Sequence, residues 1–134
     1  MPSAATSRLS APILLAPVFR ALSDPTRLRL LLLLRQGLLC VGDLVSVLDL
    51  AQPKVSRHLA SLRRARLVED EKRGLWCFYR LAPARPRAHR KIFEVLEAAS
   101  SEVPEAAADA AALRRLRSKG GCCPQHQRAP RRTP

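Results

Sequence analysis

The sequence lacks a long uninterrupted apolar stretch, and this absence argues against a membrane-spanning segment. Its densest apolar run is the stretch of leucines at 30–34, which Arg29 and Arg35 flank, whereas a helix across a bilayer needs about 20 apolar residues. The apolar run at 13–16 is too short for a secretory signal and lies between two prolines. We therefore expect a cytoplasmic protein, in a compartment where cysteine thiols stay reduced.

Residue patterns typical of enzymes are also missing. The sequence shows no pairing of a nucleophile with a base, no glycine-rich loop for a phosphate and no paired carboxylates in a plausible cleft. An enzyme is therefore the least favoured class of function. No internal repeat is visible, and 134 residues with 47% hydrophobic content fit a single domain with its own core.

Negative charge is scarce in this chain. It has 11 Asp and Glu residues against 24 Lys and Arg residues, which gives a formal net charge of +13. A surface this basic attracts polyanions at long range, and nucleic acid is the usual partner. An anionic membrane surface and plain solubility are the alternatives that charge alone leaves open.

Apolar residues recur at three- and four-residue steps in the first half of the chain, which predicts helices at 13–22, 26–36, 41–48 and 52–65. Asp24 and Pro25 favour the start of the second helix, because an Asp side chain accepts free N–H groups and proline has no N–H to lose. Gly37 tolerates a left-handed backbone and is expected to end that helix. The second helix is apolar on nearly every side, so we expect it at the centre of the domain.

The predicted helix at 52–65 carries two separate stripes of side chains. One is apolar and suited to the core (Val55, Leu59, Leu62), and the other is polar and basic (Lys54, Arg57, His58, Ser61). A helix of this kind can lie in the major groove of DNA while its apolar side is anchored. An ordinary solvated helix face is the alternative interpretation.

Two short β-prone runs, 67–70 and 75–81, flank a glycine-containing turn at 71–74 and predict a β-hairpin directly behind that helix. We expect the tip of the hairpin to carry Lys72 and Arg73, where they can contact phosphates or the minor groove. A surface turn that happens to be charged is the alternative.

The last third of the chain predicts two more helices, at 87–99 and 104–117. The first has an apolar cluster (Ile92, Phe93, Val95, Leu96) that so small a body cannot cover, so we assign it to a dimer interface. His89 has no partner at metal-ligand spacing and is expected at the surface. The flanking segments, 1–11 and 119–134, are rich in Ala, Ser, Pro and Arg and are interpreted as flexible arms around a domain at 12–118.

Four motifs, in order, resemble the ArsR/SmtB family over about half of the chain. They are Ala-Leu-Ser-Asp-Pro-Thr-Arg-Leu at 21–28, Leu-Cys-Val-Gly-Asp-Leu at 39–44, Gln-Pro-Lys-Val-Ser-Arg-His-Leu at 52–59, and Gly-Leu-Trp with Tyr-Arg-Leu at 74–81. The resemblance implies a mostly α-helical winged helix-turn-helix protein with a small β-hairpin. It also implies a homodimeric repressor that binds double-stranded operator DNA, senses arsenicals or metal ions, and requires no cofactor.

The resemblance assigns DNA contacts to one helix and to the hairpin. The residues that it implies are Gln52, Lys54, Ser56, Arg57 and His58, together with Lys72 and Arg73 in the wing. Ala51 departs from the family, in which a serine often caps this helix. We therefore expect Gln52 to serve as the cap, at a cost of some tenths to about 1 kcal/mol.

The thiols depart further from the family pattern. The arsenic signature of the family is Cys-Val-Cys-Asp-Leu, often followed by another Cys, and here only Cys40 remains. Gly42 and Val45 occupy the other two positions. One thiolate is too few for trivalent arsenic, which takes three in a trigonal pyramid.

The adjacent pair Cys122 and Cys123 offers replacement thiols behind two glycines. Their basic neighbours are expected to lower the thiol pKa, and soft thiolates select trivalent arsenic or antimony. We hypothesise that this pair binds arsenite, methylarsenite or antimonite as effector, with Cys40 as a third ligand only if the tail folds back.

Other roles for these thiols stay open. They include a loose zinc site with His126, a response to another metal or to thiol oxidation, and no sensing role at all in a basic DNA-binding protein. Cys77 is interpreted as a small hydrophobic residue packed in the hairpin strand.

Overall fold

The computed structural model describes residues 15–83 and 87–122. After a helical segment at 15–22, the elements are α2 (Pro25–Leu34), β1 (Leu39–Cys40), α3 (Val41–Leu48), α4 (Gln52–Arg64), β2 (Val68–Arg73), β3 (Trp76–Leu81), α5 (Arg87–Ala99), a 3-10 turn (Ser100–Glu102) and α6 (Ala106–Ser118). The predicted arm at 1–11, Cys123 and His126 lie outside the described residues. The prediction of a mostly helical chain with a small β-sheet is confirmed.

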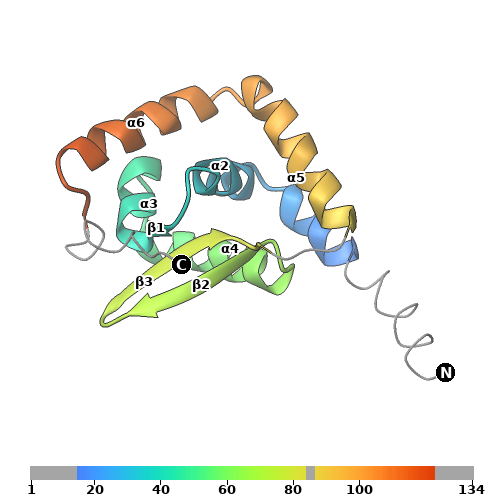
Figure 1. The fold of residues 1–134 in the computed structure, drawn as a ribbon, viewed down its shortest axis with the longest axis horizontal. Helices are drawn as coiled ribbons and strands as arrows, with labels where there is room; N and C mark the ends of the chain where they lie inside the picture. Colours follow the sequence, from blue (N-terminus) through green and yellow to red (C-terminus); the bar gives the residue numbers. More distant parts are fainter. Residues whose placement is uncertain (1–14, 84–86, 123–134) are drawn as a thin grey trace.

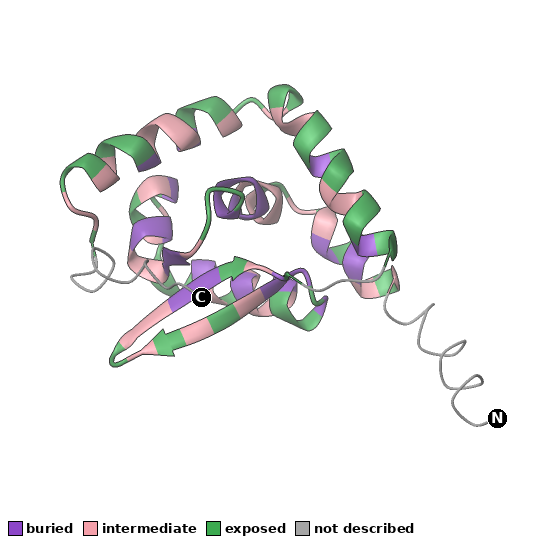
Figure 2. Cartoon of the chain, in the orientation of Figure 1, coloured by how far each residue is buried: buried purple, intermediate pink, exposed green. Residues whose placement is uncertain are grey.

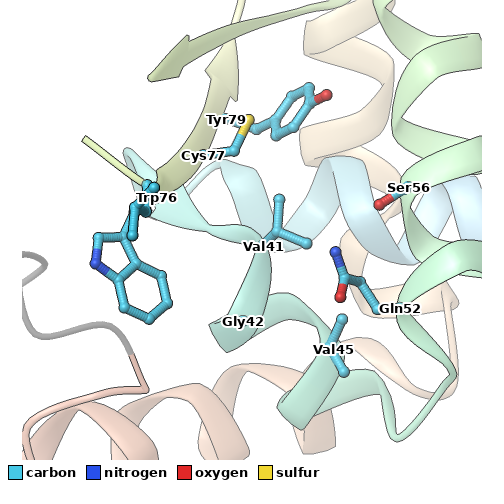
Figure 3. A pocket seen from close by; sticks show the side chains of 9 residues that line it. Val41, Gly42, Val45, Gln52, Ser56, Trp76, Cys77 and Tyr79 are labelled. Carbon is cyan, nitrogen blue, oxygen red and sulfur yellow. The ribbon is translucent and has the colours of Figure 1, made fainter. Parts of the chain in front are cut away.

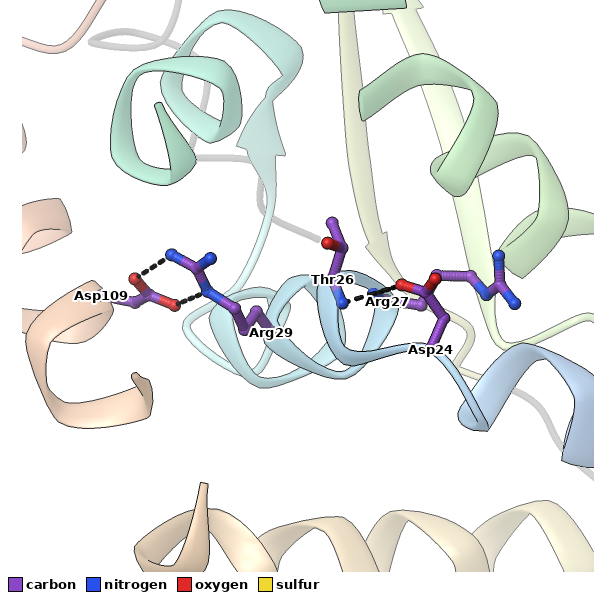
Figure 4. Close-up of polar contacts among 5 residues, drawn as sticks. All are labelled: Asp24, Thr26, Arg27, Arg29 and Asp109. Atoms are coloured by element: carbon purple, nitrogen blue, oxygen red, sulfur yellow. Dashed lines mark hydrogen bonds and ion pairs between the residues drawn. The ribbon is translucent and has the colours of Figure 1, made fainter. Parts of the chain in front are cut away.

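Helix α2 lies at the centre of the molecule (Figures 1 and 2), as predicted. All five leucines at 30–34 are buried, and burying each side chain contributes roughly 1.5–3 kcal/mol. Asp24 begins the helix by accepting the N–H groups of Thr26 at 2.8 Å and Arg27 at 3.1 Å (Figure 4). This cap fixes where the central helix starts relative to the helical segment at 15–22.

Helices α3 and α4 form a helix-turn-helix unit. Asp49 adopts a left-handed backbone (φ 56°) at the end of α3 and turns the chain toward α4. The predicted apolar stripe of α4 is confirmed, because Val55, Leu59 and Leu62 are fully buried. The opposite side of α4 is therefore held at the surface.

The hairpin belongs to a three-stranded antiparallel sheet with the order β1-β3-β2. Strand β1 pairs Leu39 with Tyr79. It was not predicted from the sequence, because two residues are too few to show an alternating pattern. The predicted turn at 71–74 is wrong. Arg73 pairs with Trp76 in the register, so only Gly74 and Leu75 form the turn.

Helices α5 and α6 follow one another on the side of α2 that lies away from the hairpin (Figure 1). Arg29 of α2 donates two hydrogen bonds of 2.8 Å to the Asp109 carboxylate of α6, which anchors α6 (Figure 4). The expectation that His89 lies at the surface is wrong, since only 2% of it is exposed. Among the described residues, none of the helices combines the length and apolar character needed to cross a bilayer.

Candidate nucleic-acid interface and thiol site

The polar face of α4 is presented to solvent. Gln52, Lys54 and Arg57 are exposed, and Ser56 and His58 are half-buried. The buried side of the helix fixes its orientation, so these side chains are held in one direction. The expected role of Gln52 as a cap is wrong: Ala51 is the N-cap residue, no side chain caps the helix there, and Gln52 is already helical.

Arg27, for which the sequence predicted no role, links His58 to the start of α2. The Arg27 guanidinium lies 3.2 Å from His58 Nδ1 and also donates to the backbone oxygens of Ala21 at 2.8 Å and Arg20 at 3.1 Å. Burial lowers the pKa of His58, although the Asp24 carboxylate opposes this shift. A neutral ring that accepts the Arg27 hydrogen bond at Nδ1 carries its own hydrogen on Nε2, where it can donate to DNA.

The two basic residues of the wing, which is the β2–β3 hairpin, differ in their surroundings. Both are the last residues of β2, directly before the two-residue turn at the tip of the hairpin. Lys72 is exposed. Arg73 forms an ion pair with Glu71 at 2.7 Å, and its guanidinium lies over the Phe78 ring at 5.4 Å from the centroid. Lys72 is therefore the freer of the two to meet a phosphate.

A cavity of about 400 Å³ separates the start of α4 from the wing (Figure 3). Gln52 and Ser56 of α4 line it, opposite Val41 and Val45 of α3 and beside Cys77 of β3. Cys77 also packs against the core, which confirms its interpretation as a small hydrophobic residue. Burial raises the pKa of its thiol, and the Asp70 carboxylate adds to this rise.

Cys40 stands at the start of α3 and is fully buried. Its Sγ accepts the backbone N–H of Asp43 at 3.4 Å, so this sulfur caps the helix. Cys40 is disulfide-bonded in the structure, whereas Cys77 and Cys122 are free thiols. A ligand role for Cys40 therefore belongs to the reduced protein.

The chain returns from α6 to α3 through Gly120 and Gly121. Both glycines have positive φ, 99° and 77°, and Gly121 N–H donates to the Leu116 oxygen at 3.0 Å, which reverses the chain at the end of α6. The next residue, Cys122, donates its backbone N–H to Asp43 Oδ1 at 2.8 Å. Cys40 and Cys122, which are far apart in the sequence, thus contact the same residue.

The expectation that basic neighbours lower the thiol pKa is wrong for Cys122. Burial raises its pKa, the Asp43 carboxylate raises it further, and a hydrogen bond with Ser46 acts in the opposite direction. The neighbour that matters is the acidic Asp43, which lies far away in the sequence and close in the fold.

The thiol site is only partly contained in the described residues. Within 15–83 and 87–122, no three His, Cys, Asp or Glu side chains gather in an arrangement that holds a metal ion. The structure brings Cys122 and Cys40 to one end of α3. The third predicted ligand, Cys123, lies outside these ranges.

Comparisons with known proteins match the part of the chain that holds α2, α3 and α4. Residues 24–70 match the bacterial regulatory proteins of the arsR family. The chain is 51% identical over 71 residues to the arsenic resistance transcriptional regulator ArsR1 of Pseudomonas putida, covering 52% of this chain and 56% of that protein. It is 50% identical over 78 residues to the arsenical resistance operon repressor of Escherichia coli, covering 58% of this chain and 67% of the repressor.

Solved structures show the same fold. The homodimeric winged helix-turn-helix DNA-binding domain Mb0332 of Mycobacterium bovis superposes with a TM-score of 0.60 and is 26% identical, covering 73% of this chain and 88% of that domain. HlyU of Vibrio cholerae superposes with a TM-score of 0.56 and is 32% identical, covering 64% of this chain and 90% of HlyU.

Proposed function

The chain belongs to the arsR family of bacterial regulatory proteins, and from this premise we propose that it is a homodimeric repressor released from its operator by a trivalent arsenical. The family consists of DNA-binding transcription regulators, so the chain is a regulator and not an enzyme. We propose that it acts in the cytoplasm on double-stranded DNA, with α4 in the major groove and the wing on the phosphates.

The exposed face of α4 supports this mode of DNA binding. Lys54 and Arg57 project from a helix whose other side is fully buried, and an Arg side chain at such a position can pair with a guanine edge. The homodimeric state of the Mycobacterium bovis domain supports a dimer with two copies of α4, the proposed reading helix. A dimer of this kind reads an inverted repeat with half-sites about one helical turn apart.

The surface of α5 supports the same assembly. Of the four apolar residues on α5 that the sequence assigned to a dimer interface, Leu96 is buried and Ile92 and Phe93 pack against the core of the same chain, so that expectation is wrong for these three. Val95 is 64% exposed. Covering such a residue in a partner subunit removes apolar surface from water. We therefore keep α5 as the proposed contact between the two subunits.

The observation that carries the arsenical proposal is the hydrogen bond from Cys122 to Asp43, because it brings a tail thiol to the helix that Cys40 caps. The close similarity to two arsenic resistance regulators supports the choice of ligand. Thiols are soft ligands and select soft acceptors such as trivalent arsenic and antimony.

The raised pKa of the Cys122 thiol is compatible with this chemistry. Methylarsenite, CH3As(OH)2, condenses with two RSH groups to give CH3As(SR)2 and two H2O. Arsenite, As(OH)3, condenses with three to give As(SR)3 and three H2O. Each leaving hydroxide takes one thiol proton, so protonated thiols suffice at equilibrium. We assign methylarsenite to Cys122 and Cys123, and arsenite to these two with Cys40.

The position of α3 supports a route from the ligand to DNA. Helix α3 contacts both α6 and α4, so a ligand that ties Cys122 to the start of α3 acts one helix away from α4. Moving α4 within one subunit changes the spacing of the two reading helices in the dimer. The dimer then no longer fits both half-sites.

The test is operator release by the reduced protein. Fluorescence anisotropy on DNA from upstream of the gene is followed while arsenite, methylarsenite, antimonite, Zn²⁺ or Cd²⁺ is added. The wild type should dissociate with the arsenicals, and a variant carrying both Cys122→Ser and Cys123→Ser should bind DNA equally well but stay bound. Cys77→Ser is the matched control and should respond like the wild type. Release of the double variant at the wild-type arsenical concentration would contradict the proposal.

A response to thiol oxidation is the second candidate, and the disulfide of Cys40 favours it. In that case, an oxidant without any metalloid should change the operator affinity of the wild type, and Cys40→Ser should abolish the change. Release by Zn²⁺ alone would instead favour a zinc site in the tail. Binding to every DNA sequence alike would indicate a non-sensing basic protein.

A further inference from the structure

We infer that Asp43 is a positioning residue that docks Cys122 on α3, so that the Cys122 thiol serves the effector site of its own subunit. This inference rests on the proposed function and specifies where its ligands come from. The alternative is a site shared between subunits, in which the tail of one chain reaches Cys40 of its partner.

Asp43 is placed to serve two cysteines at once. Its side chain is fully buried, yet Oδ1 accepts the backbone N–H of Cys122 at 2.8 Å, and its own backbone N–H donates to Cys40 Sγ at 3.4 Å. Hydrogen bonds to a carboxylate oxygen are among the stronger ones in proteins. Asp43 thus fixes the backbone of Cys122, which is an exposed residue and a free thiol.

The short connection after α6 confines the tail to its own subunit. Helix α6 ends at Ser118, and only three residues separate it from Cys122. Helix α6 itself is held on α2 by the bidentate Arg29–Asp109 ion pair and by Leu113, which is 2% exposed. While α6 stays on its own α2, the three-residue connection places Cys122 at the start of α3 in the same chain.

The two glycines give the connection its direction. Gly120 and Gly121 occupy the left-handed region, which side chains with a Cβ rarely adopt. The chain therefore leaves α6 along one path, toward the start of α3. The ion pair, the glycine turn and Asp43 together deliver the Cys122 backbone to the helix that Cys40 caps.

Subunit mixing tests the inference with the full-length reduced protein. A heterodimer is purified through two different affinity tags, with Cys40→Ser in one subunit and Cys122→Ser plus Cys123→Ser in the other. Sites within one subunit leave this heterodimer with no complete set of three thiols, so arsenite stoichiometry should fall from two per wild-type dimer to none. One arsenite bound per heterodimer would overturn the inference.

Substitution of Asp43 tests its positioning role. Asp43→Ala should weaken methylarsenite binding at least tenfold, whereas Asp43→Asn, which keeps an oxygen acceptor for Cys122 N–H, should stay within about threefold of the wild type. Thermal unfolding identifies any variant that does not fold. For such a variant, the arsenite stoichiometry of the heterodimer tests the inference instead. A folded Asp43→Ala protein with wild-type affinity would overturn the role of Asp43.

Amide hydrogen exchange separates this inference from the proposed function. The Cys122 amide should be protected in the reduced wild type and exchange at least tenfold faster in Asp43→Ala, with no arsenical present. If the wild type binds no arsenical but shows this protection, the proposed effector is wrong and the docking by Asp43 stands. If the amide is unprotected in the wild type, the docking inference fails whatever the effector.

Discussion

The interface on α4 and the wing differs from the thiol site on α3 in how the chain builds it. The first uses neighbouring stretches of sequence, from Gln52 to Leu81, on elements that pack directly on the core. The second joins Cys40 to Cys122 through a single buried residue, Asp43. A site built from one helix and the adjoining hairpin depends on local structure, whereas a site closed by the end of the chain depends on every contact that holds α6 in place.

The largest expected effect concerns the α4 side. A dimer with two reading helices and two wings should neutralise several phosphates, and with roughly 6–10 such contacts its operator affinity falls about 10³–10⁵-fold between 50 and 200 mM salt. Anisotropy titrations over that range measure the slope. Arsenical affinity should change little, because the effector is uncharged. If operator affinity depended only weakly on salt, the DNA interface and the thiol site would not differ in this respect.

A substitution that weakens the packing of α6 should lower arsenical affinity and leave DNA affinity nearly unchanged. Asp109→Ala leaves Arg29 without its bidentate partner, and losing hydrogen bonds between charged groups costs about 1.5–3 kcal/mol, less the part that solvent screens at the partly exposed Arg29. We expect weaker arsenical binding with nearly unchanged DNA affinity, measured on the same protein sample. Glu97→Ala removes an exposed ion-pair partner of Arg35 on α5 and is the matched control. Equal losses at both sites would contradict their independence.

In the DNA interface on α4 and the wing, loss of a base contact and loss of a phosphate contact should have different effects on operator binding. Arg57→Ala should cost about 1–3 kcal/mol of operator binding and relax the choice at one base position. Lys72→Ala should weaken binding to all sequences alike and reduce the salt slope by about 1. Competition assays with single-base operator variants distinguish the two. Arg114→Ala, on the exposed face of α6, should change neither quantity. Unchanged operator preference in Arg57→Ala would mean that α4 is not the reader.

The smallest expected effect is a pH dependence of stability at His58. Burial lowers its pKa in the folded protein, so above the unfolded pKa of about 6.5 the ring is neutral in both states. As the pH falls below that value, the unfolded chain takes up the proton more readily and stability declines through the lower folded pKa. Between pH 7.5 and 5.5, the unfolding midpoint temperature of His58→Gln should therefore fall by less than that of the wild type. Equal losses would mean that His58 does not contribute.

Local patterns predicted most of the fold correctly. The bounds of α3 and α5 agree with the expected 41–48 and 87–99, and the apolar stripe of α4 is buried as expected. Such elements follow from short-range periodicity and caps, such as Asp24 at the start of α2. The predicted position of the hairpin turn was wrong. The register of β2 against β3 depends on pairing across the sheet, and strand propensity alone does not specify it.

Single side chains were harder to place. His89 was expected at the surface and is buried. It precedes Ile92, Phe93 and Leu96 by three, four and seven residues, so it lies on the apolar face of α5 that packs inward. The residues that the sequence proposed for DNA contact remain predictions, although α4 does hold Lys54 and Arg57 exposed. Arg27 was overlooked, since its partner His58 is 31 residues away.

Residues close together in the chain are enough to predict the helix-turn-helix unit, the central leucine helix and the basic face of α4, because each depends on neighbours within a few residues. The contact of Cys122 with Asp43, and the raised pKa of the Cys122 thiol, depend on packing between segments far apart in the chain. The basic residues beside Cys122 in the chain suggested the opposite shift, because charge along a sequence says nothing about what lies across a fold. Burial and a carboxylate from α3 set that pKa, and both exist only once α6 has packed.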